Sequence, residues 1–80
     1  MKPPPAQIDG ARVLHFSILD PRHESAVGLA LCRYDRDSSV FLFGCDENWA
    51  CLIHTRHQTV EEAMTQAEFE YDCVPKWRSL

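Results

Sequence analysis

The residues with the clearest potential for chemistry lie within one stretch of thirteen residues. Cys45, Cys51, His54 and His57 are of the types that zinc prefers as ligands. In the strand register derived below, both thiols lie on one face of a sheet, His54 lies on the other face, and His57 follows in a loop. Because the four side chains do not converge in that register, we predict no metal site.

A nucleophilic thiol with a nearby base is a second chemical possibility. The same register places His15 opposite Ala30, on the face that also carries Cys32 and Cys51, and a thiol beside an imidazole is a known arrangement for covalent catalysis. The sequence contains no signal for a lowered thiol pKa, an oxyanion site or a pocket. We therefore expect no catalytic centre, and the protein is predicted not to be an enzyme.

Phosphate or cofactor binding has even less support in the sequence. The three glycines are far apart and none of them opens a helix, so no glycine-rich phosphate loop is present. The backbone N–H groups at the predicted helix start, with Arg56 and His57 beside them, could hold a small anion. Glu61 and Glu62 compete for the same position, and we expect no cofactor.

The elements that would position these residues follow from hydrophobic patterning. A chain of 80 residues has room for a single core. Four runs rich in β-branched, aromatic or aliphatic residues are bounded by turn formers: residues 11–19, 26–34, 39–45 and 49–55. The connections are too short for parallel crossovers, so neighbouring strands must be antiparallel. The sheet is predicted to be a meander.

The pattern then changes to a helical period. Thr59 and Glu62 have the spacing of a capping box, which starts a helix by satisfying two backbone N–H groups. Apolar residues recur behind it at three- and four-residue spacing: Val60, Ala63, Met64, Ala67 and Tyr71. The helix should run over residues 60–72 and end before Pro75. The predicted fold is α+β, a four-stranded antiparallel meander sheet followed by one C-terminal helix packed on one face.

The first ten residues lack strand or helix signals. Residues 3–5 are three consecutive prolines, and Asp9-Gly10 is turn chemistry, so residues 1–10 are predicted to be a flexible tail before a single domain of residues 11–80. Neither a secretory signal nor a membrane-spanning run is visible, and none of the four cysteines forms a C-x-x-C pair. We expect reduced thiols in a cytoplasmic protein.

Turn lengths assign the side chains to two faces. Phe43 is predicted opposite Cys51, and Phe41 opposite Ile53. One face becomes aliphatic and is the expected seat of the helix: Leu14, Phe16, Ile18, Val27, Leu29, Leu31, Val40, Leu42 and Leu52. The other face is aromatic and carries the candidate interface residues Tyr34, Phe41, Phe43, Trp49 and Ile53.

One helix covers only about half of one face of four strands. The aromatic face therefore needs a cover, which could come from the C-terminal tail with Trp77, from the N-terminal prolines or from another chain. We predict a homodimer that buries this face.

The predicted helix is strongly acidic and contains no Lys or Arg. Glu61, Glu68 and Asp72 line one flank, and Phe69 points away from the apolar stripe, so these four residues could form a docking surface for a basic protein. The alternative is a solvated face on which Phe69 packs against the tail and the acids are neutralised by Arg56, Lys76 or Arg78. The net charge of −4 disfavours nucleic acid and anionic membranes as partners.

Residues 43–49, 59–63 and 66–71 resemble segments of a group of small uncharacterised bacterial proteins. These proteins share a Cys-Asp-x-x-Trp turn and a closing helix with Glu-Glu-Ala and Ala-Glu-x-Glu-Tyr, here Cys45, Asp46 and Trp49 followed by the helix. The resemblance implies the strand, turn and helix order and implies no activity. In size, acidity and layout the chain is also similar to immunity proteins that neutralise bacterial toxins by binding them.

These observations favour a small, non-catalytic protein-binding or self-associating module. A toxin-neutralising protein of the immunity type is one alternative. The other is a small thiol enzyme or zinc-binding module that uses Cys51, His15, His54 or His57.

Overall fold

The computed structural model describes residues 1–80 and contains one helix and one antiparallel sheet, which confirms the α+β class. The sheet has six strands, so the predicted number of four is wrong. The elements are β1 (Gln7–Ile8), β2 (Ala11–His23), β3 (Ala26–Arg33), β4 (Val40–Cys45), β5 (Cys51–His57), α1 (Val60–Tyr71) and β6 (Arg78–Ser79).

Strands β1 to β5 lie side by side in chain order, and each pairs antiparallel with the next. Strand β6 pairs with β2 and comes from the C-terminal segment. The two additional strands, β1 and β6, have two residues each. A two-residue strand is too short to show the alternation by which strands are recognised in a sequence.

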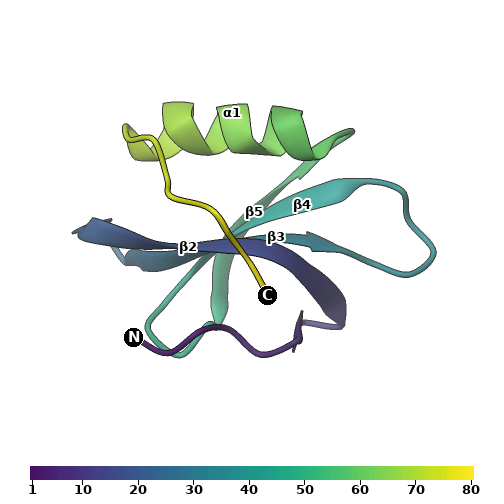
Figure 1. The fold of residues 1–80 in the computed structure, drawn as a ribbon, viewed down its shortest axis with the longest axis horizontal. Helices are drawn as coiled ribbons and strands as arrows, with labels where there is room; N and C mark the ends of the chain where they lie inside the picture. Colours follow the sequence, from purple (N-terminus) through teal and green to yellow (C-terminus); the bar gives the residue numbers. More distant parts are fainter.

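Helix α1 packs on one face of the sheet (Figure 1) and begins as the capping box predicts. Thr59 Oγ1 accepts a hydrogen bond from the Glu62 backbone N–H at 3.1 Å, while Glu62 Oε2 accepts one from the Gln58 N–H at 3.0 Å. The helix ends at Asp72, whose φ of 51° leaves the helical region. At 12 residues, α1 is too short, and too polar, to cross a membrane.

The face beneath α1 is aliphatic, as predicted for its central strands. Leu29, Leu31, Val40 and Leu42 are buried there with residues of the helix and of the strand ends: Leu19, Ala26, Ala63, Ala67 and Tyr71. Trp77, from the C-terminal segment, packs against this helix-side cluster. Small residues of the helix at Ala63 and Ala67 allow its close approach to the sheet.

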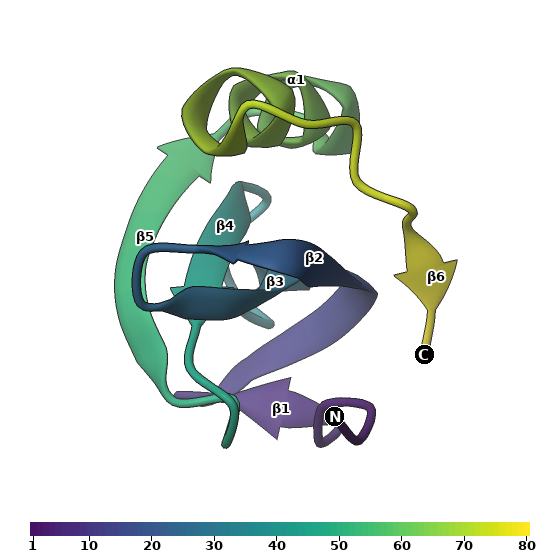
Figure 2. The ribbon, with the colours of Figure 1, turned by 90° about the vertical axis from the view of Figure 1, so that its left-hand side faces the viewer.

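The other face is covered by the N-terminal segment, which lies on the opposite side of the sheet from α1 (Figure 2). Pro4 and Ile8 are buried, and the Val13 N–H donates to Ala6 O at 2.9 Å. The prediction that residues 1–10 form a tail outside the domain is therefore wrong. Burial of Ile8 and strand pairing by β1 make this segment part of the core.

The register between β2 and β3 differs from the prediction by one residue. Phe16, not His15, pairs with Ala30, because the hairpin continues to His23 opposite Ala26 and the register shifts between Ile18 and His23. A second shift, between Val13 and His15, lies further along β2. Because a one-residue shift turns every side chain to the other face, Phe16 is buried on the N-terminal side rather than beneath the helix. Ile18, also predicted under the helix, is exposed.

The register between β4 and β5 also differs. Phe43 pairs with His54 and Phe41 with Arg56, three residues further along β5 than predicted. The turn is two residues longer than predicted, since Cys45 pairs with Cys51, and a bulge that leaves Leu52 without a partner beside Gly44 adds the third. His54 therefore lies with the aromatic rings, 5.9 Å from the Phe43 ring centroid, and not on the helix side.

The bulge also changes the positions of Leu52 and Ile53. Ile53 moves to the helix side, where it approaches Gly44, and Leu52 is half exposed on the outer strand instead of packing under α1.

The turn between β4 and β5 explains the Cys-Asp-x-x-Trp pattern. The Asp46 carboxylate accepts hydrogen bonds from the N–H groups of Asn48 at 2.8 Å and Ala50 at 3.0 Å. Trp49 has a φ of 62° and packs its indole against the sheet at Gly28. A side chain at position 28 would clash with the indole, because a Cβ there would lie 2.6 Å from Trp49 Cζ3. The indole N–H donates to Lys2 O at 2.8 Å and so holds the N-terminal segment.

Candidate functional site

The outer face of α1 carries all four residues predicted for the docking surface. Glu61, Glu68, Phe69 and Asp72 are exposed, and we call them the acidic helix face. Phe69 is the most exposed large apolar side chain of the molecule, with 86% of its surface accessible. The helix buries only Ala63, Ala67 and Tyr71 against the sheet, so its outer side is free.

The acids of this surface have no basic partner. The one ion pair of the chain joins Arg56 to Asp37, and the last turn of α1 contains no basic residue. The C-terminal segment leaves the helix and runs down to pair with β2 (Figure 1). Its Trp77 packs against the helix-side cluster, and Phe69 stays 86% exposed. The tail therefore does not cover Phe69, and no ion pair neutralises the acids, so these two parts of the alternative are wrong. The acids are exposed to solvent, as that alternative also expects.

Two of the three acids of the acidic helix face oppose helix stability, whereas Glu61, in the first turn, favours it. Asp72 lies at the negative end of the helix dipole, where an acid costs some tenths of a kcal/mol. Glu68 and Asp72 are four residues apart, a spacing at which like charges repel by about 0.2–0.5 kcal/mol. The left-handed backbone at Asp72 suits an aspartate, whereas no hydrogen bond or ion pair of the fold involves the Glu68 carboxylate.

A shallow hollow lies beside Phe69, with a volume of about 450 Å³. It is lined by Glu61, Glu62, Thr65, Gln66 and Phe69. Sequence reasoning missed the contribution of Glu62, Thr65 and Gln66 to this surface. Their spacing of three, four and seven residues from Phe69 is the signal that places them around it.

The aromatic interface candidates are not a free surface. Phe43 and Trp49 are only 2% and 6% exposed and belong to the core under the N-terminal segment. Tyr34 and Phe41 are half-buried and stack edge to face at 5.3 Å. Ile53 is the exception: it is 52% exposed and lies on the helix side of the outer strand, away from the aromatic rings. The protein's own N-terminus therefore supplies the cover for which a second copy was invoked.

The zinc candidates are brought into one region without converging. Cys45 is buried, His54 lies against the aromatic rings, and the His57 ring bonds to Thr55 Oγ1 at 2.7 Å. No group of three or more His, Cys, Asp or Glu side chains is placed to hold a metal ion.

The proposed base and thiols lie on opposite faces. His15 pairs with Leu31, a helix-side residue, and its Nδ1 lies 3.4 Å from Ser79 Oγ. Cys32 lies in the cluster under the N-terminal segment, and burial raises its pKa to about 12. Burial likewise raises the pKa of Cys45 to about 12. These two thiols are poor nucleophiles near neutral pH.

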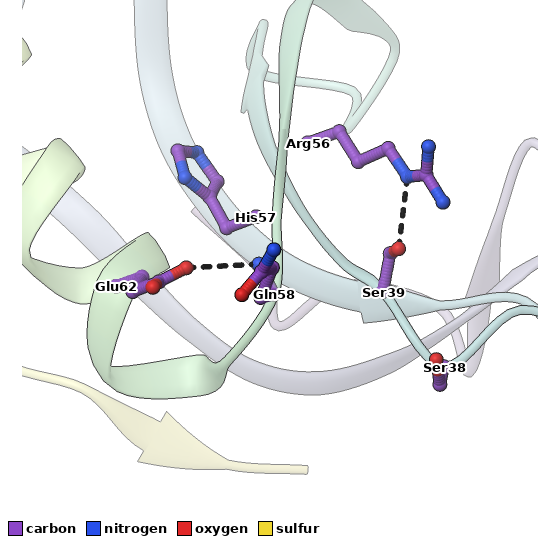
Figure 3. Close-up of a pocket in the computed structure, with 6 residues that line it drawn as sticks. All are labelled: Ser38, Ser39, Arg56, His57, Gln58 and Glu62. Carbon is purple, nitrogen blue, oxygen red and sulfur yellow. Dashed lines mark hydrogen bonds between the residues drawn. The ribbon is translucent and has the colours of Figure 1, made fainter.

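A polar hollow lies at the start of the helix, where a small anion was considered (Figure 3). The Arg56 and His57 side chains diverge: Arg56 reaches Ser39 Oγ at 2.8 Å on one side of β5, and His57 extends to the other side. The N–H groups of Gln58 and Glu62 are already bonded within the capping box. With Glu62 facing the hollow, the arrangement is unfavourable for an anion.

Comparison of the chain with protein-family models, curated proteins and solved structures finds no match in any of the three. The Cys-Asp-x-x-Trp turn, on which the resemblance to small bacterial proteins rests, has a structural role here. Asp46 shapes the turn and Trp49 fills the core under the N-terminal segment. The function must therefore be argued from the surface.

Proposed function

We propose that this protein is a non-catalytic protein-binding module that docks a basic protein surface on the acidic helix face. The observation that supports the proposal best is the 86% exposure of Phe69 among acids that have no ion pair. An aromatic side chain supplies apolar contact area, and the surrounding carboxylates select a cationic partner.

The cost of the charges to the helix supports a role outside folding. Residues that serve binding are often placed where they destabilise the fold, because binding rather than stability retains them. Glu68 and Asp72 fit this description, since both oppose the helix dipole or each other. A basic partner would relieve that repulsion on binding.

The chemistry of the surface also limits the class of partner. The chain has a net charge of −4, so its field repels nucleic acids and anionic membranes while it attracts cationic proteins. A basic toxin or a basic nucleic-acid enzyme is the specific version of such a partner. Neutralisation of a basic toxin, as immunity proteins achieve by binding, would be one case of this proposed activity.

The test is charge reversal on the acidic helix face. Glu68→Lys with Asp72→Lys is expected to weaken binding of a partner isolated with the wild-type protein by about tenfold, because each exposed charge contributes up to about 1 kcal/mol. The wild-type complex should also weaken as salt rises. Affinity is measured by calorimetry or surface plasmon resonance.

A matched control separates local from global charge. Asp35→Lys with Glu47→Lys makes the same change of net charge at two exposed positions outside the helix. The control should keep at least half of the wild-type affinity. Equal losses in both double variants, or no loss in either, would show that the acidic helix face is not the binding surface.

Stability provides an independent readout. Glu68→Lys removes the repulsion with Asp72, so its free energy of unfolding should stay the same or rise by a few tenths of a kcal/mol. Loss of binding together with unchanged stability identifies a binding residue. A large loss of stability would indicate instead that Glu68 serves the fold.

A further inference from the structure

Two of the four cysteines face each other across β4 and β5. Cys45 and Cys51 are direct partners in the register of these antiparallel strands. The Asp46 N–H donates to Ala50 O at 3.0 Å just beyond the pair, which makes Cys45 and Cys51 a non-hydrogen-bonded pair. The Cα atoms of such pairs are about 4.5 Å apart, within the range of about 4.4–6.8 Å that disulfides span.

Both thiols lie on the same face of the sheet. Cys45 is fully buried in the cluster under the N-terminal segment, and Cys51 packs against that cluster at its border. Cys51 is partly open to solvent, and its Sγ is 3.5 Å from Ile53 O. A rotation about the Cα–Cβ bond of Cys51 changes the direction of its sulfur without moving the backbone.

The other two cysteines lack such a partner. Cys32 stands opposite Phe41 in the register of β3 and β4. Cys73 is exposed, beyond the end of α1. The chain thus contains one pair of cysteines placed for a bond across strands, one buried single thiol and one exposed single thiol.

We propose that Cys45 and Cys51 form a redox-active dithiol that a low-molecular-weight disulfide oxidises to a cross-strand disulfide. Cys51 reacts first because it is the accessible partner. Cys45 is the resolving thiol, sheltered from the oxidant and held opposite Cys51 by the strand pairing.

The reaction is two successive thiol–disulfide exchanges. The Cys51 thiolate attacks one sulfur of the oxidant RSSR, forms a Cys51–SR mixed disulfide and releases RS⁻, which takes up a proton. Cys45 then loses its proton and attacks Cys51 Sγ, which forms the Cys45–Cys51 bond and releases the second RS⁻, protonated to RSH. The protein dithiol loses two electrons and two protons, and RSSR becomes two RSH.

The surroundings determine the rate. Burial, and then the charge of Asp9, raises the pKa of Cys51, and burial raises that of Cys45 further. Since the thiolate is the attacking species, oxidation should be slow near neutral pH and accelerate as pH rises. The Cys45–Cys51 disulfide would link the two ends of the β4–β5 turn, which contains Trp49. The Trp49 indole N–H binds the N-terminal segment at Lys2 O.

The experiment uses the full chain with Cys73→Ser, which removes the exposed competing thiol. The reduced protein is incubated with glutathione disulfide, quenched in acid, digested with trypsin without reduction and analysed by mass spectrometry. Trypsin cleaves after Lys and Arg, so Cys45 and Cys51 stay on one peptide, residues 37–56, while Cys32 falls on another. The expected product is peptide 37–56 lighter by two hydrogen atoms, which returns to its original mass after reduction.

Variants identify the bond and each role. Cys45→Ser should leave peptide 37–56 as a mixed disulfide with glutathione, and Cys51→Ser should leave it unmodified. Cys32→Ser, the matched control on the same face, should still form the internal disulfide. Circular dichroism verifies that each variant is folded. If a variant is unfolded, the mass of peptide 37–56 from the oxidised Cys73→Ser protein still shows whether Cys45 and Cys51 form a disulfide.

Three results would overturn the inference. One is a cross-linked peptide that joins Cys32 to Cys45 or Cys51. Another is a mixed disulfide at Cys51 that never resolves. The third is peptide 37–56 that stays reduced under conditions in which unfolded protein is fully oxidised.

Discussion

Two aromatic side chains of this molecule, Trp49 and Phe69, are surrounded by acidic and polar sequence but have opposite environments. Trp49 follows an acidic turn and is buried, with its N–H bonded to Lys2 O. Phe69 lies between two glutamates on α1 and is almost fully exposed. The comparison shows that neighbours in sequence do not decide burial: Trp49 has a distant segment to cover it, and Phe69 has none.

The largest effect is expected from removing the buried ring. Trp49→Ala should lower the free energy of unfolding by about 3–5 kcal/mol, because it leaves a cavity between the sheet and the N-terminal segment and frees Lys2 O. The measurement is urea denaturation followed by circular dichroism. A loss below about 1 kcal/mol would mean that the N-terminal segment does not pack on Trp49.

The second effect concerns the thiols of the same cluster. In the folded protein, burial raises the pKa of Cys32 and of Cys45 from the ordinary 9.0 to about 12. The unfolded chain therefore releases these protons at a lower pH than the folded protein does. The stability that the two neutral thiols contribute is fully present below pH 9 and should be lost as pH rises towards 12. The slope should stay below about 1.4 kcal/mol per pH unit for each thiol, because the folded and unfolded chains differ by at most one proton at each thiol.

Denaturation at several pH values between 8 and 11 measures this slope. Cys32→Ala should make the loss shallower because one buried thiol is gone. Cys73→Ala, which changes an exposed thiol, is the control and should leave the slope unchanged. If stability is constant or rises over this range, the two buried thiols do not stay neutral in the folded state.

The smallest effect is expected at the exposed ring. Phe69→Ser should change the free energy of unfolding by less than about 0.5 kcal/mol, because the side chain loses no buried contact. The same denaturation assay used for Trp49→Ala measures it. A loss of several kcal/mol would mean that Phe69 is covered in solution, for instance by a second chain, and the contrast with Trp49 would disappear.

Much of the architecture was accessible from local patterns. The limits of α1 followed from Thr59, Glu62 and the apolar spacing. The aliphatic face beneath the helix, at Leu29, Leu31, Val40 and Leu42, followed from turn lengths. The acidic helix face was also predictable, because helical geometry alone places Glu61, Glu68 and Asp72 on one flank.

The errors arose where the backbone is irregular. The register shift in β2 between Ile18 and His23 moved Phe16 to the N-terminal side, and a bulge beside Gly44 placed His54 among the aromatic rings and moved Ile53 to the helix side. Each bulge shifts the register, and a one-residue shift exchanges the faces of all residues beyond it. No local pattern in this sequence marks the shift in β2, and the bulge in β5 has only the strand glycine Gly44 beside it as a signal.

The sequence by itself determined the elements, because helix caps, turn formers and apolar periods act over a few residues. It also determined which residues of α1 are acidic and outward. Only the tertiary structure decided what covers the aromatic face, since the contact between Lys2 and Trp49 joins residues 47 positions apart. It likewise brought Cys45 opposite Cys51, because that pairing depends on the bulge and on the turn bonds of Asp46.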